Sequence, residues 1–296
     1  MTSVVRTGLV HDPSEFRERA NRVRAAGRKV SLVLTMGALH HGHGSLIRLG
    51  REHGDEVFVT VFVNPTQFGP QEDLSKYPRT LAADVELAGN EGASLVFAPE
   101  PRQMYPEGDE TRVVVPRVSQ GLCGLSRPGH FEGVATVVTK FFALAGEVTA
   151  IFGRKDYQQL QVIRTLVRDL LLPVRIVGAP TVRAADGLAE SSRNAFLSAE
   201  ERAQALAIPR ALTDAQRVFR AGERDAKTLR EAALRCLEQA GLAIDYVELA
   251  HADTLAASSA GLIPERTVLA VAAKAGSTRL IDNTVFGEDD SPLPLS

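Results

Sequence analysis

The sequence has little of the residues that mark several common protein classes. Its 296 residues include no tryptophan and only two cysteines, Cys123 and Cys236, which do not form a CxxC pair. We therefore expect neither a disulfide scaffold nor a structural zinc site, and we expect the reducing cytoplasm as the compartment. Acidic and basic residues nearly balance, with 34 Lys and Arg against 36 Asp and Glu. Because there is no basic excess, we do not expect nucleic-acid binding.

Long uncharged apolar runs are also missing. Lys140 and Glu147 interrupt one apolar stretch, and Arg168 and Asp169 interrupt the next. A helix that crosses a bilayer needs roughly 20 mostly apolar residues, and the first residues show no basic segment followed by an apolar one. We therefore expect neither a membrane span nor a secretory signal. The apolar fraction of 44% is ordinary for a folded protein.

Short β-branched runs alternate with helical patterns in the first part of the chain. Strands are predicted at 30–35, 57–63, 93–97, 150–152 and 174–177, and helices at about 43–53, 79–91, 134–145 and 156–171. This alternation is typical of βαβ units. We therefore expect an α/β fold with a Rossmann-like, doubly wound parallel sheet that binds its ligands at the carboxyl ends of the strands.

A second, smaller α+β domain is predicted after residue 182. Two helices divided near residues 221–222 are expected between 198 and 239, followed by strands at 244–249, 267–274 and 278–281. These elements do not alternate, and the chain is long enough for two cores. The predicted domains are therefore residues 1–182 and 183–296.

Three of the seven histidines lie within four residues, in the segment TMGALHHGHGSL. The segment follows the first predicted strand and leads into a helix, and the N-terminus of a helix attracts anions. His40 and His43 are three residues apart and therefore share one helical face. We favour a phosphate-binding turn. The alternatives are a glycine-rich turn with solvated histidines, or a metal pair, for which no further ligand lies nearby.

The segment FVNPTQF ends the second predicted strand. Asn64 and Gln67 bring neutral amides to the edge where ligands are expected, and such groups suit a polar organic substrate better than a metal. An ordinary turn accounts for the segment equally well.

Two further polar segments carry cations and hydroxyls. In FGRKDYQQ, Lys155 and Asp156 begin a helix, where they would serve a phosphate and a ribose hydroxyl, or would be a solvated lysine and a helix cap. In DGLAESSRN, the donors of Ser191, Ser192 and Arg193 match phosphate oxygens. The sequence has no P-loop motif.

Together these segments resemble the pantothenate synthetase (pantoate–β-alanine ligase) family of HxGH nucleotidyltransferases. The resemblance rests on TMGALHHGHGSL, FVNPTQF, YPRT, SRPGHFEGVATVVTKFF, FGRKDYQQLQVIRTLVRDL and DGLAESSRN, which occur in the family's order. It implies that pantoate attacks the α-phosphate of ATP to give a pantoyl adenylate and pyrophosphate, and that β-alanine then displaces AMP. It also implies Mg²⁺ and a homodimer, for which residues 113–115 would supply an edge strand.

The resemblance also implies roles for individual residues. The expected catalytic residues are His40, His43, Lys155, Ser191, Ser192 and Arg193. The expected nucleotide contacts are Met36, His43, Gly153, Lys155, Asp156, Val182, Ser191, Ser192 and Arg193. The expected pantoate contacts are Asn64, Gln67 and Gln159. Asp84 is the candidate Mg²⁺ contact, His130 stays outside the catalytic set, and the second domain is expected to be a lid over ATP.

Four positions depart from the family pattern. Glu190 replaces a usual Met, His41 and Arg154 each replace a usual Glu, and Gly44 replaces a usual Leu. A carboxylate beside a triphosphate would be repulsive, so we expect Glu190 to point away from the nucleotide.

Two other functions stay open at this point. One is a related nucleotidyltransferase that adenylylates a phosphorylated substrate, and the other is a nucleotide-binding homologue with impaired turnover. The neutral amides of Asn64, Gln67 and Gln159 favour an unphosphorylated hydroxy acid and therefore the ligase.

Overall fold

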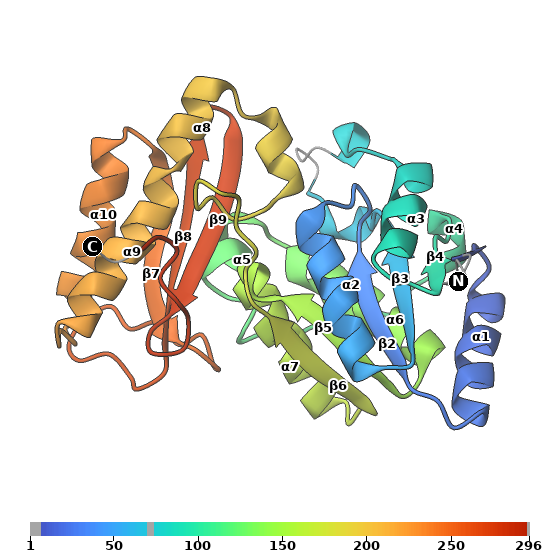
Figure 1. Cartoon of the computed structure of the whole chain (residues 1–296). Helices are drawn as coiled ribbons and strands as arrows, with labels where there is room; N and C mark the ends of the chain where they lie inside the picture. The colour runs from blue at the N-terminus through green and yellow to red at the C-terminus, as the bar shows by residue number, and fades with distance from the viewer. Residues whose placement is uncertain (1–6, 70–73, 295–296) are drawn as a thin grey trace. The chain divides into compact units, whose positions relative to one another are not determined.

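A computed structural model describes residues 7–69 and 74–294, and the chain divides into two compact units (Figure 1). The first unit comprises Met1–Arg154 and Val162–Ala179, and the second comprises Lys155–Gln161 and Pro180–Ser296. The short segment 155–161, which carries several of the predicted site residues, therefore belongs to the second unit.

The first unit contains a six-stranded parallel sheet in the order β1-β4-β3-β2-β5-β6. Its strands are β1 (Gly8–Val10), β2 (Val30–Thr35), β3 (Glu56–Val61), β4 (Leu95–Phe97), β5 (Val148–Gly153) and β6 (Val174–Ala179). The chain moves outward in one direction from β2 to β3 and in the other from β5 to β6. The switch point, where a doubly wound sheet binds ligands, therefore lies between β2 and β5.

Helices cover both faces of this sheet. The helices in this part of the chain are α1 (Pro13–Ala25), α2 (His41–His53), α3 (Leu81–Asn90), α4 (Pro101–Met104), α5 (Leu122–Ser126), α6 (His130–Ala145) and α7 (Tyr157–Asp169). The 3-10 turns between them are η1 (Pro65–Gln67), η2 (Leu74–Lys76) and η3 (Arg154–Asp156). The unit boundaries fall within η3, within α7 and directly after Ala179.

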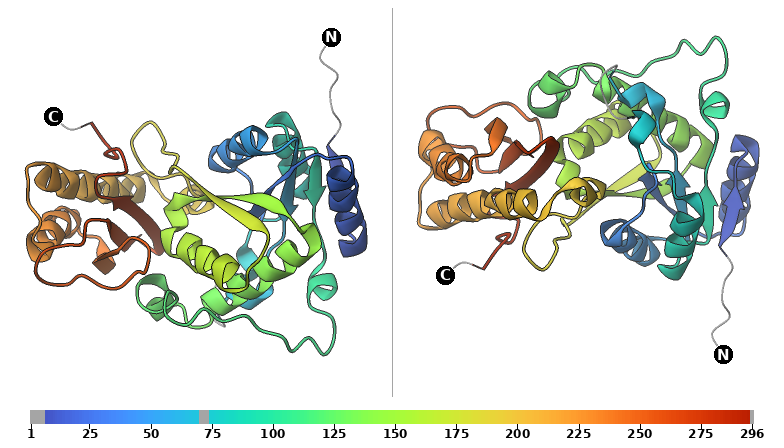
Figure 2. Two further views of the ribbon diagram at one scale, coloured as in Figure 1. Left: turned by 90° about the horizontal axis from the view of Figure 1, so that it is seen from below. Right: turned by 90° about the horizontal axis from the view of Figure 1, so that it is seen from above.

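The side chains of β3 point alternately to the two faces of the sheet, and this determines which helices pack on each face. Val59 joins a buried cluster with Ile47 of α2 and Ala88 of α3. The next side chain back, Phe58, faces the other side, where its ring lies 5.7 Å from that of Phe16 in α1. Because successive strand residues point to opposite faces, α2 and α3 cover one face of the sheet and α1 the other (Figure 2).

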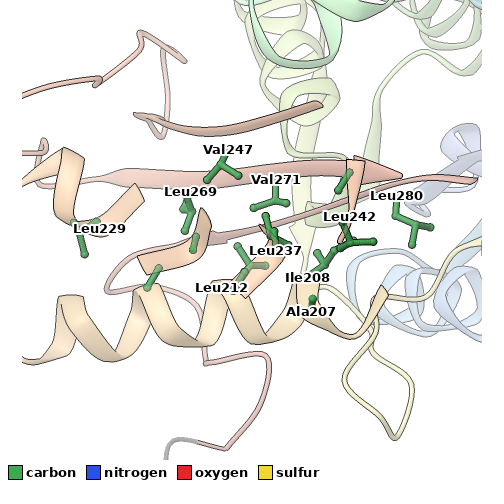
Figure 3. Packing of buried hydrophobic residues seen from close by; sticks show 14 of the residues in the cluster. Ala207, Ile208, Leu212, Leu229, Leu237, Leu242, Val247, Leu269, Val271 and Leu280 are labelled. Atoms are coloured by element: carbon green, nitrogen blue, oxygen red, sulfur yellow. The ribbon is translucent and has the colours of Figure 1, made fainter. Parts of the chain in front are cut away.

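The second unit has helices packed on one antiparallel sheet. Its elements are η4 (Ser192–Phe196), α8 (Ala199–Ala205), α9 (Ala207–Arg220), α10 (Ala226–Gln239), β7 (Ala243–His251), β8 (Thr267–Ala275) and β9 (Thr278–Val285). The sheet order is β7-β8-β9. Val247 and Leu269 of the sheet share one buried core with Leu212 and Leu237 of the helices (Figure 3). The predicted fold class, a doubly wound parallel sheet with a smaller α+β unit, is confirmed.

Several local expectations change. The sequence patterns do not predict the strand β1 or the helix α1. The helical stretch before residue 221 is divided into α8 and α9, because Pro209 cannot donate a hydrogen bond to the helical carbonyl four residues earlier. Residues 113–115 form no strand: the Val113 amide donates to the Thr136 hydroxyl at 3.0 Å, and Pro116 follows directly. Among the described residues, no helix is both long and apolar enough to cross a membrane.

Candidate active site

The turn between β2 and α2 is built on two residues with positive φ. Gly37 has φ +82° and Ala38 has φ +50°. A Cβ at position 37 would lie 3.0 Å from both the Asp84 carboxylate and the Val61 side chain. Glycine is therefore needed at position 37, on both conformational and steric grounds.

The Asp84 carboxylate anchors this turn from α3. It accepts hydrogen bonds from the backbone amides of Ala38 (3.1 Å) and Leu39 (2.8 Å) and from the Thr80 hydroxyl (3.2 Å). Asp84 is only 2% exposed, so these three charge-assisted bonds are shielded from water. They fix the backbone that leads to the histidine pair.

The residues around Asp84 do not fit a metal site built by the protein. Three hydrogen bonds already engage its carboxylate. The described residues also contain no group of three or more His, Cys, Asp or Glu side chains that could hold a metal ion. The Mg²⁺ contact at Asp84 stays a prediction, and the structure gives this residue a clear anchoring contact instead.

His40 and His43 cap the start of α2 reciprocally. His40 Nδ1 accepts from the Gly42 amide at 3.2 Å, and His43 Nδ1 accepts from the His40 amide at 3.3 Å. Their rings lie 4.2 Å apart between centroids. A backbone N–H can only donate, so each neutral ring carries its proton on Nε2. The pair therefore has two Nε2–H donors at the positive end of a helix.

The predicted pantoate contacts of the first unit form a buried amide pair beside β3. Asn64 is 1% exposed and Gln67 is 8% exposed. The Asn64 amide donates to Gln67 Oε1 and to the Gly133 carbonyl of α6, both at 3.1 Å. The Gln67 amide nitrogen lies 2.9 Å from the Met36 sulfur. The structure thus brings Met36, Asn64 and Gln67 into direct contact.

His130 supports the backbone of this same segment. Its Nδ1 lies 2.9 Å from the Gln67 carbonyl oxygen, and its Nε2 lies 3.0 Å from a guanidinium nitrogen of Arg127. A carbonyl only accepts and a guanidinium only donates, so Nδ1 carries the proton and Nε2 accepts. His130 is therefore a structural contact of the Gln67 turn.

In the second unit, Lys155, Asp156 and Gln159 lie on η3 and the first turn of α7. The Lys155 carbonyl accepts a hydrogen bond from the Asn283 side chain of β9 at 2.8 Å. Asp156 is exposed, and Lys155 and Gln159 are half-buried. Tyr157, which is 5% exposed, packs in a buried cluster of the same unit. Backbone and core contacts therefore hold this segment, while its charged side chains remain accessible.

Residues 182–190 form a tight hairpin tied to β9. The Glu190 amide donates to the Val182 carbonyl at 2.9 Å. Arg183 makes a bidentate contact with Asp282 at 2.6 and 3.1 Å, and Asp282 is only 3% exposed. Glu190 thus uses its backbone within the hairpin, and Asp282 holds the hairpin to the sheet.

The serine–arginine segment follows this hairpin. Ser191 caps η4, its hydroxyl accepting from the Arg193 amide at 3.3 Å. Ser192 and Arg193 form the first turn of η4 and are half-buried. The side-chain amide of Asn194 donates to the Ala189 carbonyl at 3.0 Å, which joins η4 to the hairpin.

The predicted site residues thus form two sets, one in each unit. The first set is Met36, His40, His43, Asn64, Gln67, Asp84 and Gly153. The second set is Lys155, Asp156, Gln159, Val182, Ser191, Ser192 and Arg193.

Sequence reasoning missed the residues that support these sets. Asp282 and Asn283 had a signal, because they are two adjacent polar residues directly after the apolar pair Leu280 and Ile281. Tyr105, whose hydroxyl donates to Asn64 Oδ1 at 2.7 Å, had none, since it lies in a short segment without periodicity.

The parallel sheet and the side chains at its edge define a Rossmann-like α/β enzyme. A family model described as pantoate-beta-alanine ligase matches residues 8–285. The pantothenate synthetase of Azotobacter vinelandii is 53% identical over 271 residues, which are 91% of this chain and 95% of that protein.

Solved structures agree with this match. The pantothenate synthetase of Thermus thermophilus has a TM-score of 0.87 at 40% identity, covering 97% of this chain and 100% of that one. The pantoate-beta-alanine ligase of Francisella tularensis, complexed with beta-gamma ATP and beta-alanine, has a TM-score of 0.76 at 30% identity. It covers 94% of this chain and 97% of that one. The chain belongs to the pantoate–β-alanine ligase family, which confirms the resemblance and the assignment as an AMP-forming ligase.

Proposed function

We propose that this chain condenses pantoate with β-alanine, using ATP, through a pantoyl adenylate. The observation that carries the proposal is the reciprocally capped pair His40 and His43, which supplies two fixed N–H donors at a helix N-terminus. Such a site suits a transferring phosphoryl group, for which catalysis is mostly positioning and charge stabilisation.

In the first step, a carboxylate oxygen of pantoate attacks the α-phosphorus of ATP, and the bond from that phosphorus to the bridging oxygen breaks. Pyrophosphate leaves with the electron pair. A carboxylate with a pKa near 4 is already ionised at neutral pH, so the step needs no general base. His40 and His43 donate through Nε2 to the oxygens on which negative charge increases.

The two amides of the first unit, together with Gln159, hold pantoate. Neutral amides bind a hydroxy acid without repelling its negative charge. Asn64 and Gln67 are supported for this role by their burial and mutual hydrogen bond.

Lys155, Ser191, Ser192 and Arg193 hold charge on the phosphates during the same step. Met36, Gly153, Asp156 and Val182 contact the nucleotide. The domain at 183–296 acts as a lid that closes when Ser191, Ser192 and Arg193 bind phosphate. The half-buried state of Lys155 and Arg193 supports the role of their cationic groups as donors to a ligand.

In the second step, the neutral amine of β-alanine attacks the acyl carbon of the adenylate. The bond from that carbon to the AMP oxygen breaks, AMP leaves, and the new amide nitrogen loses its proton. The products are pantothenate and AMP.

Three finer expectations belong to the proposal. Mg²⁺ enters with ATP as a ligand of the phosphates, whose charge it screens, because the described protein residues do not fit a metal site of their own. The protein forms a homodimer, which sedimentation tests directly. It acts in the cytoplasm, in keeping with a sequence that contains only two cysteines.

The test is pyrophosphate release by the purified protein, measured before and after β-alanine is added. We expect pantoate-dependent pyrophosphate in a burst of about one equivalent per site, then steady turnover and pantothenate, identified by mass, once β-alanine is present. A burst with a phosphorylated acceptor in place of pantoate would favour the adenylyl-transferring alternative. Nucleotide binding without any pyrophosphate would favour a homologue with impaired turnover.

A further inference from the structure

We propose that Gly133 is a positioning residue for pantoate: it lets the first turn of α6 lie against the backbone of Gln67, and so sets where Gln67 meets the substrate. The proposal rests on the proposed function, in which Gln67 binds pantoate. It is carried by contacts within the first unit, between α6 and the 3-10 turn η1.

Position 133 has no room for a side chain. A Cβ on Gly133 would lie 2.4 Å from the Thr66 carbonyl oxygen, 2.6 Å from the carbon of that carbonyl and 2.7 Å from the Gln67 nitrogen. All three atoms belong to one planar peptide group, so none of them can turn away as a side chain would. Because an ordinary van der Waals contact begins at 3.4 Å, even alanine would push η1 and α6 apart by about 1 Å.

The carbonyl of Gly133 also sets the orientation of the Asn64 amide. A carbonyl can only accept, so the nitrogen of Asn64 faces it, at 3.1 Å. The second N–H of this nitrogen donates to Gln67 Oε1, also at 3.1 Å. Asn64 is 1% exposed, so these bonds are shielded from water. The side chain of Gln67 is therefore tied to α6 through Asn64.

His130 holds the backbone of Gln67 from the same turn of α6. It lies three residues before Gly133 and therefore on the same face of the helix. Its Nδ1–H donates to the Gln67 carbonyl oxygen at 2.9 Å. One helical turn thus contacts Gln67 on both sides of its backbone, Gly133 at the nitrogen and His130 at the carbonyl.

A small displacement of Gln67 is expected to matter for the reaction. Hydrogen bonds from nitrogen to oxygen have a narrow range of about 2.7–3.2 Å, and a misplacement of about 1 Å can lower a rate by about 100-fold. Gln67 belongs to the pantoate contacts, whereas most of the proposed ATP contacts lie in the second unit. A change at Gly133 should therefore act on pantoate much more than on ATP.

The experiment compares the steady-state kinetics of Gly133→Ala with those of the wild type. We expect kcat/KM for pantoate to fall by about 10- to 100-fold, mostly through KM, while the KM for ATP stays within about twofold. Alanine has a higher helix propensity than glycine, so a weakened α6 could not explain the loss. Gly133→Ser, which adds one more atom, should lose at least as much.

Gly50→Ala is the matched control, because it makes the same change inside another helix of the first unit, α2. A Cβ on Gly50 would meet only side-chain atoms, of Val57 at 3.2 Å and of Ser31 at 3.5 Å, so no peptide has to move. We expect its constants for pantoate and ATP to stay within about twofold of the wild type.

A double-mutant cycle separates positioning from general damage to the fold. In a Gln67→Ala background, Gly133→Ala should add less than about threefold to the loss in kcat/KM for pantoate, because the side chain that it positions is already gone. If Gly133→Ala does not fold, His130→Ala releases the Gln67 carbonyl without adding an atom. It should raise the KM for pantoate by about fivefold and leave the KM for ATP unchanged.

Three results overturn the proposal. They are an unchanged kcat/KM for pantoate in folded Gly133→Ala, an equal rise in the KM for pantoate and for ATP, and a full additional loss in the Gln67→Ala background. Where Gly133→Ala does not fold, a wild-type KM for pantoate in His130→Ala overturns it. A wild type that releases no pyrophosphate with pantoate would defeat the proposed function itself, whereas an active wild type with an unaffected Gly133→Ala defeats this proposal alone.

Discussion

The two sets of candidate site residues differ in how the fold holds them. In the first unit, buried side chains hold the functional groups directly: Asp84 at 2% exposure fixes the turn before the histidines, and Asn64 at 1% exposure fixes Gln67. In the second unit the support acts mostly on the backbone, as where Asn283 binds the Lys155 carbonyl. The side chain of Lys155 itself remains half-buried and accessible.

This difference suits two different functions, stabilisation of the transition state and binding of the triphosphate. Groups that must meet a transition state gain from being fixed before the substrate arrives, because no energy is then lost to reorganisation. Groups that capture a flexible, highly charged triphosphate gain from long side chains that adjust to it. We therefore expect substitutions in the first set to lower kcat/KM most strongly. Substitutions in the second set, apart from those of the pantoate contact Gln159, should act mainly on ATP affinity.

The largest expected effect on activity is that of His40→Asn. Asparagine is a good helix cap, so the start of α2 should be preserved while the Nε2–H donor is lost. We expect kcat/KM to fall by about 100-fold or more, with a change in unfolding free energy below about 1 kcal/mol. Parallel assays and urea denaturation provide the measurement.

His41→Asn is the matched control for this variant. It removes an imidazole from the next residue, which is exposed, and should leave kcat/KM within about twofold. Equal losses in the two variants would mean that His40 has no special part in catalysis.

Asp84→Asn should have the largest effect on stability. The side-chain NH₂ of the asparagine would face the backbone amides of Ala38 and Leu39 or the Thr80 hydroxyl, where the carboxylate now accepts. At least one buried hydrogen bond is therefore lost, and the negative charge is removed. We expect a loss of about 2–4 kcal/mol in unfolding free energy and a lower kcat, both from the displaced turn. Asp214→Asn, at a half-exposed ion pair on α9, should cost less than about 1 kcal/mol.

The Mg²⁺ dependence of Asp84→Asn also tests the alternative role of this residue. An anchoring carboxylate predicts that the Mg²⁺ concentration for half-maximal activity stays within about twofold of the wild type. A metal ligand predicts the reverse, with unchanged stability and a large increase in the Mg²⁺ requirement.

In the second unit, Asn283→Ala should act on ATP alone. The variant removes the donor to the Lys155 carbonyl, and one hydrogen bond of this kind corresponds to about a fivefold change in affinity. We expect the KM for ATP to rise by that factor while the KM for pantoate is unchanged. A rise in both constants would show that the two sets are not held independently.

The smallest expected effect is that of Glu190→Met. The Glu190 amide bonds within the hairpin at the Val182 carbonyl, and this backbone contact does not depend on the side chain. If the carboxylate points away from the nucleotide, the KM for ATP should stay within about twofold of the wild type. A decrease of more than tenfold would place the carboxylate beside the phosphates, where its repulsion would be on the order of 4 kcal/mol at 4 Å.

Much of the fold follows from local patterns in the sequence. The buried run at 30–35 coincides with β2, because a parallel strand covered on both faces is apolar nearly throughout. β1 could not be found in this way, since three residues are too few to show a period. Pro209 indicates in the sequence that the helical stretch is interrupted nearby. The position of the break between α8 and α9, however, depends on where the second of these helices begins.

The supporting contacts of the site are harder to predict, because they join residues far apart in the sequence. Asn64 depends on the Gly133 carbonyl, 69 residues away, and Lys155 depends on Asn283, 128 residues away. The site residues themselves could be named because they lie in short motifs at strand ends. The charge of Asp84 marks this residue in the sequence, whereas its anchoring contacts become visible only in the fold.

The most direct test of the central claim is the fate of oxygen in the pantoate carboxylate. When pantoate labelled with ¹⁸O in both carboxylate positions reacts to completion with ATP and β-alanine, the adenylate route transfers one label to the phosphate of AMP. Formation of a pantoyl adenylate predicts AMP that carries one ¹⁸O, pantothenate that keeps the other, and unlabelled pyrophosphate. Label in pyrophosphate or in free phosphate, with unlabelled AMP, would contradict it.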